Sequence, residues 1–565
     1  MPTRSARRWF AAATAGLLAA ASLSPAPASA ADAPNKFLVF SKTAGFRHDS
    51  IPQGITAIQQ LGAANNFTVA ATEDANQFTT ANLAQYKAVV FLSTTGDVLN
   101  ATQQTAFESY INGGGGYVGI HAAADTEYGW PYYGTLVGAW FASHPAQQSA
   151  QIRVEDRAHA ATAHLGQTWT RTDEWYNYQT NPRSTAKILA NLNESSYSGG
   201  SMSGDHPITW CKKIGNGRSF YTGLGHTQAS YSEAAFRSQL LGGIRYAAGW
   251  AKQDCRPETG YTAIYNGSTT GWSVAGSGSM TNSDATLTTV GGAGVYWYSA
   301  RQYASYSLKL DWRLPGDDDS GVFVGFSSGA TAGSTGYEVQ LDATNVANGT
   351  TGSVWGAKGV DVAARDAALN PPGTWNTFEL LVEGERLRIY LNGSLINDFT
   401  NADPNRSLTS GYIGLQLNGA ADDVNYRNVR IKELGAPPSS QTVEGESFSS
   451  GSGVQVAGHA PASGGQTLGY IDNGDWAGYA SVSTSGRNRF SARISSAGAG
   501  GTITIRSGSQ TGTVLGTVAV PNTGGWETFQ TVQTTITPGS GPLFLSFSGG
   551  SGSLFDVDTL TLSTS

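Results

Sequence analysis

The stretch GGGGYVGIHAA, residues 113–123, decides how the first part of the chain folds. Asn100 and Gln103 have the spacing of a capping box, which predicts a helix that ends at the glycines 113–116. The apolar run 117–120 is long enough for one buried strand, and His121 follows it directly. This order of helix, turn, strand and polar residue is typical of one unit of an α/β sheet.

Residues 31–252 repeat that order. Apolar runs at 36–40 and 87–92 predict two more buried strands, with a run of helical spacing between them that starts at Ile51. Late strands are expected near 208–214 and 219–224, before a helix at 233–250. Strands that alternate with helices predict an α/β domain with a largely parallel sheet, whose ligands bind beyond the carboxyl ends of the strands.

Three histidines follow predicted strands, at His48, His121 and His226. Imidazoles that meet carboxylates at one sheet edge can hold a divalent metal or carry out acid–base chemistry, so these residues are catalytic candidates. A local hydrogen bond is the alternative for each histidine taken singly. The carboxylates nearby in the sequence are Asp125, Asp173 and Glu174, of which Glu174 is the catalytic candidate.

Four stretches of this domain resemble the trehalose-utilisation (ThuA-like) family: GFRHDS (45–50), GGGGYVGIHAA (113–123), DEWY (173–176) and GRSFYTGLGH (217–226). The resemblance implies a flavodoxin-like fold of the class I glutamine-amidotransferase type and an association with keto-sugar metabolism. In amidotransferases the sharp turn after a strand carries a cysteine nucleophile. Because His121 stands at that turn here, cysteine-based chemistry is not expected.

The stretch GYEVQLD, residues 336–342, is the most informative part of the next region, 258–435. Strand periodicity places Glu338, Gln340 and Asp342 on one face and the apolar residues between them on the other. A face with two carboxylates and an amide can bind sugar hydroxyls or supply an acid–base pair, whereas an ordinary solvated face is the alternative. Short alternating runs separated by turns predict two packed antiparallel sheets.

Motifs along this whole region, among them DWR (311–313), SGVF (320–323) and YRN (426–428), resemble the 3-keto-disaccharide hydrolase domain. The resemblance implies a concanavalin-like β-sandwich (jelly roll) with Glu338 as the first catalytic candidate. Gln340, Asp342 and Arg313 are expected to support it, and Arg427 with Trp375 to bind substrate on the same concave sheet, where Trp355 is a second stacking candidate. This sequence departs from the family at Asp319, where asparagine is usual, and at 325–326, where an arginine often follows.

The last region, 442–565, follows a short linker at 436–441 and is rich in Gly, Ser and Thr with short alternating strands, which predicts a second β-sandwich. The stretches VEGE (443–446), GYIDNGDW (469–476), GGWET (524–528) and FDVD (555–558) resemble family 6 carbohydrate-binding modules. The resemblance implies that Tyr470 and Trp526 hold a sugar ring between them; a place in the core is the alternative. Further implied roles are substrate binding by Asp475 and Ser553, and structural Ca²⁺ binding by Glu444, Glu446 and Asp558.

Residues 1–30 resemble an export signal, with early arginines, a short apolar run and the small residues Ala28, Ser29 and Ala30 at its end. We therefore expect a secreted protein; an uncleaved anchor is the alternative, although Pro25 and Pro27 disfavour a continuous helix. Export makes a disulfide between the two cysteines, Cys211 and Cys255, as plausible as two free thiols.

Charge and composition limit the partners. The formal net charge is −7 and only 13% of residues are charged, which gives no reason to expect nucleic acid as a partner, and no membrane insertion is expected. The sequence predicts a monomer that binds a polysaccharide or oligosaccharide at its C-terminal end and hydrolyses glycosides or 3-keto-glycosides. The rival interpretation is a non-catalytic extracellular glycan-binding protein.

Overall fold

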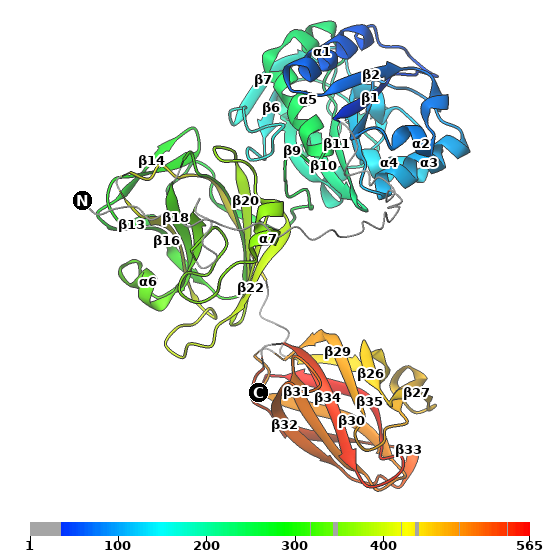
Figure 1. Cartoon of the computed structure of the whole chain (residues 1–565), viewed down its shortest axis with the longest axis vertical. Coiled ribbons are helices and arrows are strands. Elements are labelled where there is room, and N and C mark those ends of the chain that lie inside the picture. Colours follow the sequence, from blue (N-terminus) through cyan, green and yellow to red (C-terminus); the bar gives the residue numbers. More distant parts are fainter. Residues whose placement is uncertain are drawn as a thin grey trace, which may run out of the picture.

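The computed structural model describes residues 35–316, 318–342, 349–419, 421–434, 440–484, 486–539 and 541–564. These residues form three bodies in chain order, each around its own main hydrophobic core (Figure 1). The predicted export signal and all but the end of the predicted linker lie outside the described residues. We refer to the three bodies as the first, second and third domains.

The first domain is a nine-stranded sheet with the order β2-β1-β3-β4-β11-β10-β9-β6-β7. Its first five strands are parallel, as the sequence predicts. The other four are antiparallel because β10 turns back on β11 as a hairpin and β9, β6 and β7 continue from it. The strands are β1 (Lys36–Phe40), β2 (Thr68–Thr72), β3 (Ala88–Leu92), β4 (Gly116–Ile120), β6 (Gln148–Val154), β7 (Thr168–Asp173), β9 (Lys187–Leu192), β10 (His206–Ile214) and β11 (Gly217–Thr222), with a small separate pair, β5 (Phe141–Ser143) and β8 (Asn177–Tyr178).

Helices cover both faces of this sheet (Figure 1). On one face α1 packs beside α5, and on the other face α3 and α4 meet around the buried Tyr117 and Tyr133. The predicted capping box at the start of α3 is present, with Asn100 and Gln103 each bonding the backbone of the other. The helices are α1 (Ile51–Ala64), α2 (Thr80–Leu83), α3 (Ala101–Asn112), α4 (Pro131–Val137) and α5 (Ala234–Ala247).

The second domain is a sandwich of an eight-stranded and a five-stranded antiparallel sheet. Leu308, Leu310 and Trp312 of one sheet and Val339 and Leu341 of the other pack in the core between them. The eight-stranded sheet holds β12 (Thr262–Tyr265), β14 (Ser279–Ser283), β15 (Thr286–Val290), β17 (Tyr306–Arg313), β20 (Asn376–Glu383), β21 (Arg386–Leu391), β22 (Ser394–Thr400) and β24 (Asn425–Glu433). The five-stranded sheet holds β13 (Trp272–Gly276), β16 (Gly294–Tyr303), β18 (Asp319–Phe326), β19 (Tyr337–Asp342) and β23 (Gly411–Leu417); the helices are α6 (Ala332–Thr335) and α7 (Val362–Ala368).

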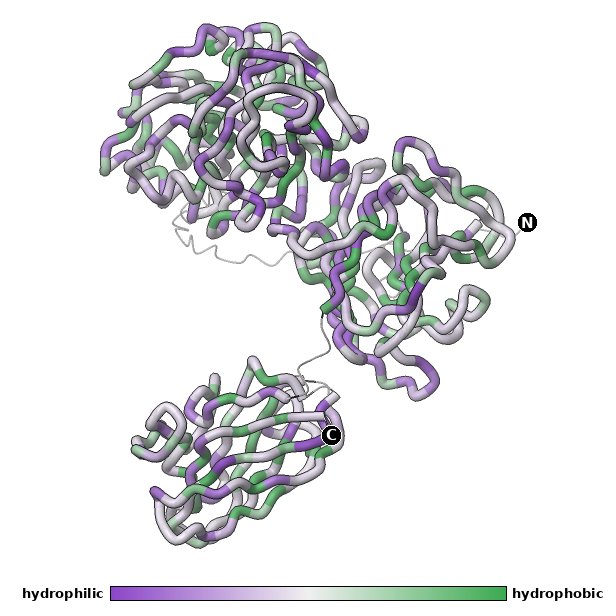
Figure 2. Tube along the Cα trace, turned by 180° about the vertical axis from the view of Figure 1, so that it is seen from behind, coloured by the Kyte–Doolittle hydropathy of each residue, from purple (hydrophilic) through white to green (hydrophobic). Residues whose placement is uncertain are grey.

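The third domain is a second antiparallel sandwich, of a six-stranded and a five-stranded sheet. Hydropathy alternates along its strands, as expected when one face of each sheet is buried (Figure 2). Its strands are β25 (Ser440–Glu444), β26 (Ser450–Ser452), β27 (Gln455–Gly458), β28 (Gln466–Gly469), β29 (Trp476–Ser483), β30 (Arg489–Ser496), β31 (Gly501–Ser507), β32 (Thr513–Val520), β33 (Gly525–Thr535), β34 (Pro542–Gly549) and β35 (Asp556–Ser563).

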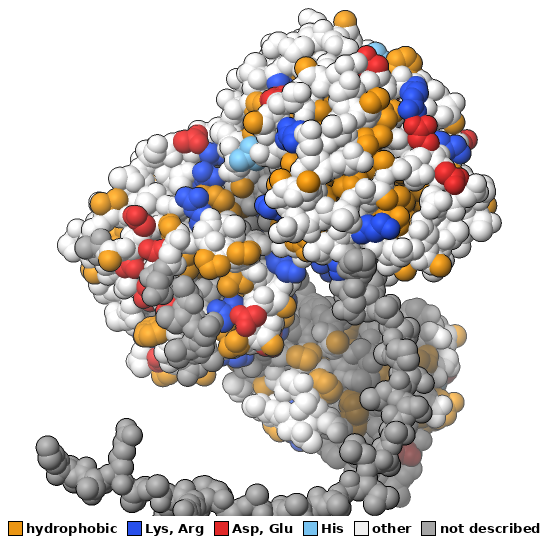
Figure 3. All heavy atoms as spheres, turned by 45° about the horizontal axis from the view of Figure 1, so that its top comes forward, with side chains coloured by type: hydrophobic (Ala, Val, Ile, Leu, Met, Phe, Trp, Pro, Cys, Tyr) orange, Lys and Arg blue, Asp and Glu red, His pale blue; other side chains and the backbone are white. Residues whose placement is uncertain are grey.

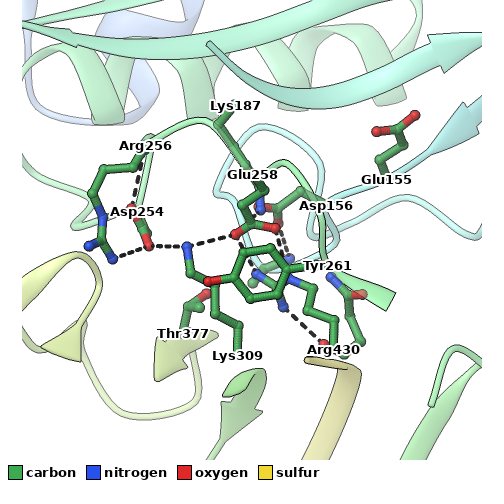
Figure 4. A network of polar contacts seen from close by, with 12 residues as sticks. Glu155, Asp156, Lys187, Asp254, Arg256, Glu258, Tyr261, Lys309, Thr377 and Arg430 are labelled. Atoms are coloured by element: carbon green, nitrogen blue, oxygen red, sulfur yellow. Dashed lines mark hydrogen bonds and ion pairs between the residues drawn. The ribbon is translucent and has the colours of Figure 1, made fainter. Parts of the chain in front are cut away.

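The first two domains meet through a buried network of charges (Figure 4). At its centre the Glu258 carboxylate lies 2.5 Å from Lys187 Nζ of β9, 3.0 Å from Lys309 Nζ of β17 and 2.8 Å from Arg430 Nε of β24. Lys309 Nζ also lies 2.8 Å from an Asp254 oxygen. The segment that joins the domains is therefore held against both of them.

A disulfide joins Cys211 of β10 to Cys255, just after the last helix of the first domain. Of the two alternatives that the sequence leaves open, the structure has the disulfide. It ties the interdomain segment covalently to the sheet beside Glu258.

On the face shown in Figure 3, cationic and anionic side chains lie interspersed among uncharged ones. Within the described ranges, helices of membrane-spanning length and hydrophobicity are absent.

Candidate functional site

The first domain gathers its candidate residues at one edge of the sheet. His48 follows β1, His121 follows β4 and His226 follows β11, three strands whose carboxyl ends share that edge. Glu174 directly follows β7 and reaches the same place. Each of the four offers a ligand atom within 4.8 Å of the others, and together they could hold a metal ion. We call these four residues the His–Glu centre.

Short contacts connect the members of the centre. Glu174 Oε2 lies 3.1 Å from His226 Nδ1 and 3.5 Å from His121 Nε2, and these two ring nitrogens are 3.2 Å apart. The His48 ring packs edge-on against the rings of both other histidines, with centroid separations of 4.8 and 5.2 Å. The convergence that parallel strand ends predict is therefore present.

The backbone and the tautomer of His121 are fixed by its surroundings. Its φ of 53° is in the left-handed region, at the sharp turn after β4. Its Nδ1 lies 3.0 Å from the Gly223 carbonyl oxygen. Because a carbonyl only accepts, Nδ1 donates a hydrogen to it, and Nε2 faces Glu174 and His226.

Burial and the neighbouring charges set the ionisation of the centre. Burial, followed by the proximity of His121 and His226, lowers the pKa of His48 to about 3, so this ring is neutral at neutral pH. Burial acts to raise the pKa of Glu174, but hydrogen bonds from His121 and His226 outweigh it and hold that pKa below its usual value. Burial acts to lower the pKa of His226, but the nearby Glu174 carboxylate has the larger effect, so the pKa of His226 is raised.

The two nearby aspartates that the sequence singles out, Asp173 and Asp125, take supporting positions. Asp173 is fully buried, accepts hydrogen bonds from the backbone N–H groups of Gly225 and His226, and pairs with Arg171 at 3.0 Å. Asp125 accepts a hydrogen bond of 2.6 Å from the Tyr128 hydroxyl.

Two neighbours of the centre were missed from the sequence. His144 Nδ1 lies 3.1 Å from Glu174 Oε1, and Phe46, whose ring is 68% exposed, packs edge-on against His48. The signal for Phe46 was its place in the GFRHDS stretch. His144 follows the short strand β5, for which periodicity gives no sign.

The second domain places Glu338 in a pocket of about 680 Å³. The ring of Trp355, 56% exposed, lines the same pocket and is its largest exposed apolar group. The other lining side chains are Phe323, Tyr337, Ala357, Phe399, Thr400, Ala402, Asp403 and Arg406.

Glu338 itself is nine-tenths buried, and its Oε1 has no hydrogen-bond partner among the described residues. It leans over Gly321 of β18, where a Cβ would come within 2.4 Å of Oε1, so only glycine leaves room for this carboxyl. Burial, and then the nearby Asp319 carboxylate, raise the pKa of Glu338 to about 7. Burial together with Asp342 and Asp422 raises the pKa of Asp319 to about 6.

The predicted polar face of β19 is present. Gln340 Nε2 donates to Asp319 Oδ1 at 2.5 Å. The amide therefore lies beside the carboxyl groups of Asp319 and Glu338, whose pKa values are raised. Asp342 is the cross-strand neighbour of Asp319 in the register of β18 and β19.

The prediction that Glu338 shares a concave face with Arg313, Arg427 and Trp375 is wrong. Side chains alternate along a strand, and the core holds Leu308, Leu310 and Trp312 of β17, so Arg313 points out of the eight-stranded sheet. The core also holds Val339 and Leu341 of β19, so Glu338 points out of the five-stranded sheet. The sandwich therefore separates them. Trp375, only 5% exposed, lies under both guanidinium groups, 4.2 Å from Arg427 and 5.1 Å from Arg313, and is no free platform.

In the third domain Tyr470 is 57% exposed and Trp526 is half-buried, so Tyr470 is not a core residue. Hydrogen bonds connect their loops: Leu554 N donates to Ile471 O, Ser496 Oγ to Leu554 O, and Thr523 N to Ser496 O. Ser553, exposed, lies on the same set of loops.

Asp475, which is expected to bind substrate, also bonds within its own loop. Its Oδ2 accepts a hydrogen bond of 2.8 Å from the Asp472 backbone and its carboxylate lies over Gly453. Asp475 therefore closes a turn, since its carboxylate is already bonded within its own loop.

Glu444, Glu446 and Asp558 gather where the ends of the third domain meet. The Oε2 atoms of both glutamates are buried without a hydrogen-bond partner in the described part of the chain. Burial, and then the charges of Glu444 and Asp558, raise the pKa of Glu446. Asp558 is fully buried and pairs with Arg493, while its Oδ1 accepts from Ser463 N. Crowded carboxylates with free oxygens suit a hard cation such as Ca²⁺.

Comparison with known proteins gives one family model for each domain. The model described as trehalose utilisation matches residues 36–247, that of a 3-keto-alpha-glucoside-1,2-lyase-like domain matches 260–432, and that of a family 6 carbohydrate binding module matches 444–564.

Individual relatives match single parts of the chain. An endo-1,4-beta-xylanase A of Thermoclostridium stercorarium is 37% identical over 150 residues, which are 24% of this chain and 28% of the xylanase. A ThuA-like protein structure from Bacteroides uniformis is 25% identical and covers 40% of this chain and 95% of that one, with a TM-score of 0.35. A family 6 module from Clostridium cellulolyticum in complex with xylose is 36% identical, with 22% and 98% covered and a TM-score of 0.21.

The chain thus spans little more than a quarter of the curated xylanase that it matches. The module descriptions mark a carbohydrate-active protein. This protein is composed of a trehalose utilisation (ThuA) domain, a 3-keto-alpha-glucoside-1,2-lyase-like domain and a family 6 carbohydrate binding module, in that order.

Proposed function

We propose that this protein is secreted, binds a polysaccharide or oligosaccharide through its third domain and cleaves glycosidic bonds of 3-keto-glycosides, or of simple glycosides, in its second domain. The observation that carries the proposal is Glu338, a buried carboxyl with a free oxygen in a pocket that also holds the exposed Trp355. A carboxyl with a pKa near 7 is half protonated at neutral pH and can give a proton to a leaving group.

The reaction requires a proton donor and a proton acceptor. When the C1–O bond breaks, the leaving oxygen takes the proton of Glu338. In hydrolysis a water molecule adds at C1 and loses its proton to a base. In elimination a base takes the C2 proton, made acidic by the 3-keto group, and C1=C2 forms. Asp319, which lies beside Gln340, is the nearest further carboxyl that can serve as base.

The third domain supports the glycan-binding part of the proposal. The C–H face of a pyranose packs on an aromatic ring, and Tyr470 presents such a ring to solvent on the loops that also carry Trp526. The matched module from Clostridium cellulolyticum binds xylose, which makes plant polysaccharide a reasonable first ligand class. Binding there keeps the second domain near its substrate.

Two metals belong to the proposal. Ca²⁺ would bind Glu444, Glu446 and Asp558, because two of these carboxylates have free buried oxygens. A divalent metal would bind the His–Glu centre of the first domain. The export-type residues 1–30 and the disulfide support secretion. We take the protein to be a monomer.

The rival function is glycan binding without catalysis. It gains support from the separation of Arg313 from Glu338, because no guanidinium then assists the acid from β17.

The deciding experiment incubates the protein with a panel of 3-keto-disaccharides and the parent disaccharides, beside Glu338→Gln and Glu383→Gln, an exposed glutamate of the same domain. We expect release of the leaving sugar by the wild type and Glu383→Gln, and a loss of at least 100-fold in Glu338→Gln. Incorporation of ¹⁸O from water at C1 separates hydrolysis from elimination. Equal rates for all three proteins would remove Glu338 from the reaction, and no release by any of them would leave glycan binding as the function.

A further inference from the structure

We propose that the His–Glu centre holds one first-row transition-metal ion through His48, His121, His226 and Glu174, and that the open positions of this ion bind two adjacent oxygens of a keto-sugar. The inference rests on the metal proposal above and adds the class of metal and the class of substrate. It is independent of cleavage in the second domain.

The spacing of the ligand atoms fits one ion. Ligands about 2.1 Å from a metal lie about 3.0 Å from one another at adjacent corners of an octahedron, which leaves two open positions beside four ligands, and about 3.4 Å at the corners of a tetrahedron. Glu174 Oε2, His226 Nδ1 and His121 Nε2 form a triangle with sides of 3.1, 3.2 and 3.5 Å. The ligand atom of His48 completes a set in which every pair lies within 4.8 Å. A four-ligand cage of metal-site size is therefore present before any ion enters.

The orientation of these side chains also suits a metal ion. His48 is buried, and its Nδ1 lacks a hydrogen-bond partner among the residues that the structure describes. Glu174 turns its Oε2 toward His121 and His226. The set therefore offers three imidazole rings and one carboxylate, with one buried ring nitrogen free to bind an ion.

Outer contacts orient the ligands, as they do in metal sites. The Gly223 carbonyl fixes His121 from its far side, and His144 holds the second oxygen of Glu174. The backbone of His226 is held by Asp173, which is itself paired with Arg171. Three of the four ligands are therefore held by contacts from outside the centre.

The donor atoms select the class of metal. Three imidazole nitrogens with one carboxylate suit Mn²⁺, Fe²⁺, Co²⁺, Ni²⁺ or Zn²⁺, whereas Ca²⁺ and Mg²⁺ prefer oxygen ligands alone. The other close group of metal-type side chains, His159 with Cys211 and Cys255, contains the disulfide, so its sulfurs are not thiolates. The His–Glu centre is thus the nitrogen-rich metal site of the described residues.

The open side of the centre suits a sugar. His48 and His121 form a buried floor, whereas the side chain of His226 is 17% exposed and that of His144 is 43% exposed, so the centre opens to solvent on one side. Phe46 stands on that side as an exposed ring against His48. A divalent ion with one carboxylate keeps a charge of +1, which favours a carbonyl oxygen and a neighbouring hydroxyl, while Phe46 can pack on the C–H face.

The test uses the whole mature chain, purified without a polyhistidine tag, stripped with chelator and kept in Ca²⁺ to occupy the carboxylates of the third domain. Co²⁺ is added, and its visible absorption and the stoichiometry by calorimetry are measured. We expect one site per chain, at least 100-fold weaker in His121→Ala and in His226→Gln and unchanged in His164→Ala, an exposed histidine of the same domain. Melting of the metal-free variants verifies that they fold.

Equal Co²⁺ binding by the wild type and both ligand variants would overturn the metal site. Adding a 3-keto-glucoside should shift the Co²⁺ spectrum, and the parent glucoside should shift it less; no shift with either would overturn the substrate class. The same titration on Glu338→Gln should be unchanged. Loss of cleavage in that variant with intact Co²⁺ binding therefore separates this inference from the function of the second domain.

Discussion

Glu258 at the junction of the first two domains gives the most direct test of how the chain is held together. Its carboxylate is the common partner of Lys187, Lys309 and Arg430, each at most 5% exposed. Glu258→Ala leaves these cations close together without their shared anion. Removing one partner of a buried ion pair costs about 3–5 kcal/mol, mainly because the remaining charge is uncompensated.

This free energy can be converted into a melting shift. Unfolding entropy is about 2.1 cal/mol/K per residue, or about 0.8 kcal/mol/K for the roughly 400 residues of the first two domains. A loss of about 3–5 kcal/mol then lowers their melting temperature by about 4–6 °C. Because the network contains residues of both domains, both should shift together.

The assay is scanning calorimetry of the full chain at neutral pH, where the surrounding cations hold the pKa of Glu258 far below its usual value and keep it charged. The matched control is Glu433→Ala, which breaks the exposed pair with Arg301 and should change stability by less than about 1 kcal/mol. A shift for Glu258→Ala no larger than that of the control, or one confined to a single domain, would refute the reasoning.

Four further results are expected. The pKa of Glu338 in the folded protein is raised to about 7, so between its usual pKa and pH 7 the folded state binds a proton that the unfolded state does not. The stability that this proton contributes should therefore fall as pH rises through 7. Proton donation in cleavage assays should fall over the same range. Cys211→Ser opens a disulfide with a sequence separation of 44, and denaturant titration should show a loss of up to about 4 kcal/mol. Trp355→Ala should raise KM with an unchanged melting temperature, whereas Trp375→Ala, at a buried ring, should cost about 3–5 kcal/mol. Tyr470→Ala should abolish glycan retention in affinity electrophoresis without a change in melting, and unchanged retention would remove Tyr470 from the binding site.

The first domain was largely predictable because its candidate residues follow strands. Parallel strands put their carboxyl ends at one edge, so His48, His121 and His226 had to approach one another once the sheet formed. Their mutual distances and the orienting contact of His144 depend on loop conformations that periodicity does not encode. The antiparallel half of the sheet was missed since a buried apolar run reads the same in either direction.

The second domain shows where strand reasoning stops. A period of two residues correctly places Glu338 and Gln340 on one face of β19 and Arg313 on one face of β17. It does not say which sheet each strand joins, and the two polar faces lie on opposite sides of the sandwich. Trp375 was misplaced for the same reason, because it belongs with Arg313.

Aromatic residues pose the converse difficulty, because the sequence does not separate core rings from binding rings. The structure leaves Phe46, Trp355 and Tyr470 between 56% and 68% exposed, and each stands beside one of the three candidate sites. An exposed ring forgoes the free energy that burial would give it, about 25 cal/mol per Å² of apolar surface. Under the proposed function, the exposed rings next to the His–Glu centre, the Glu338 pocket and the loops of Trp526 would gain this free energy when the apolar face of a sugar ring packs on them.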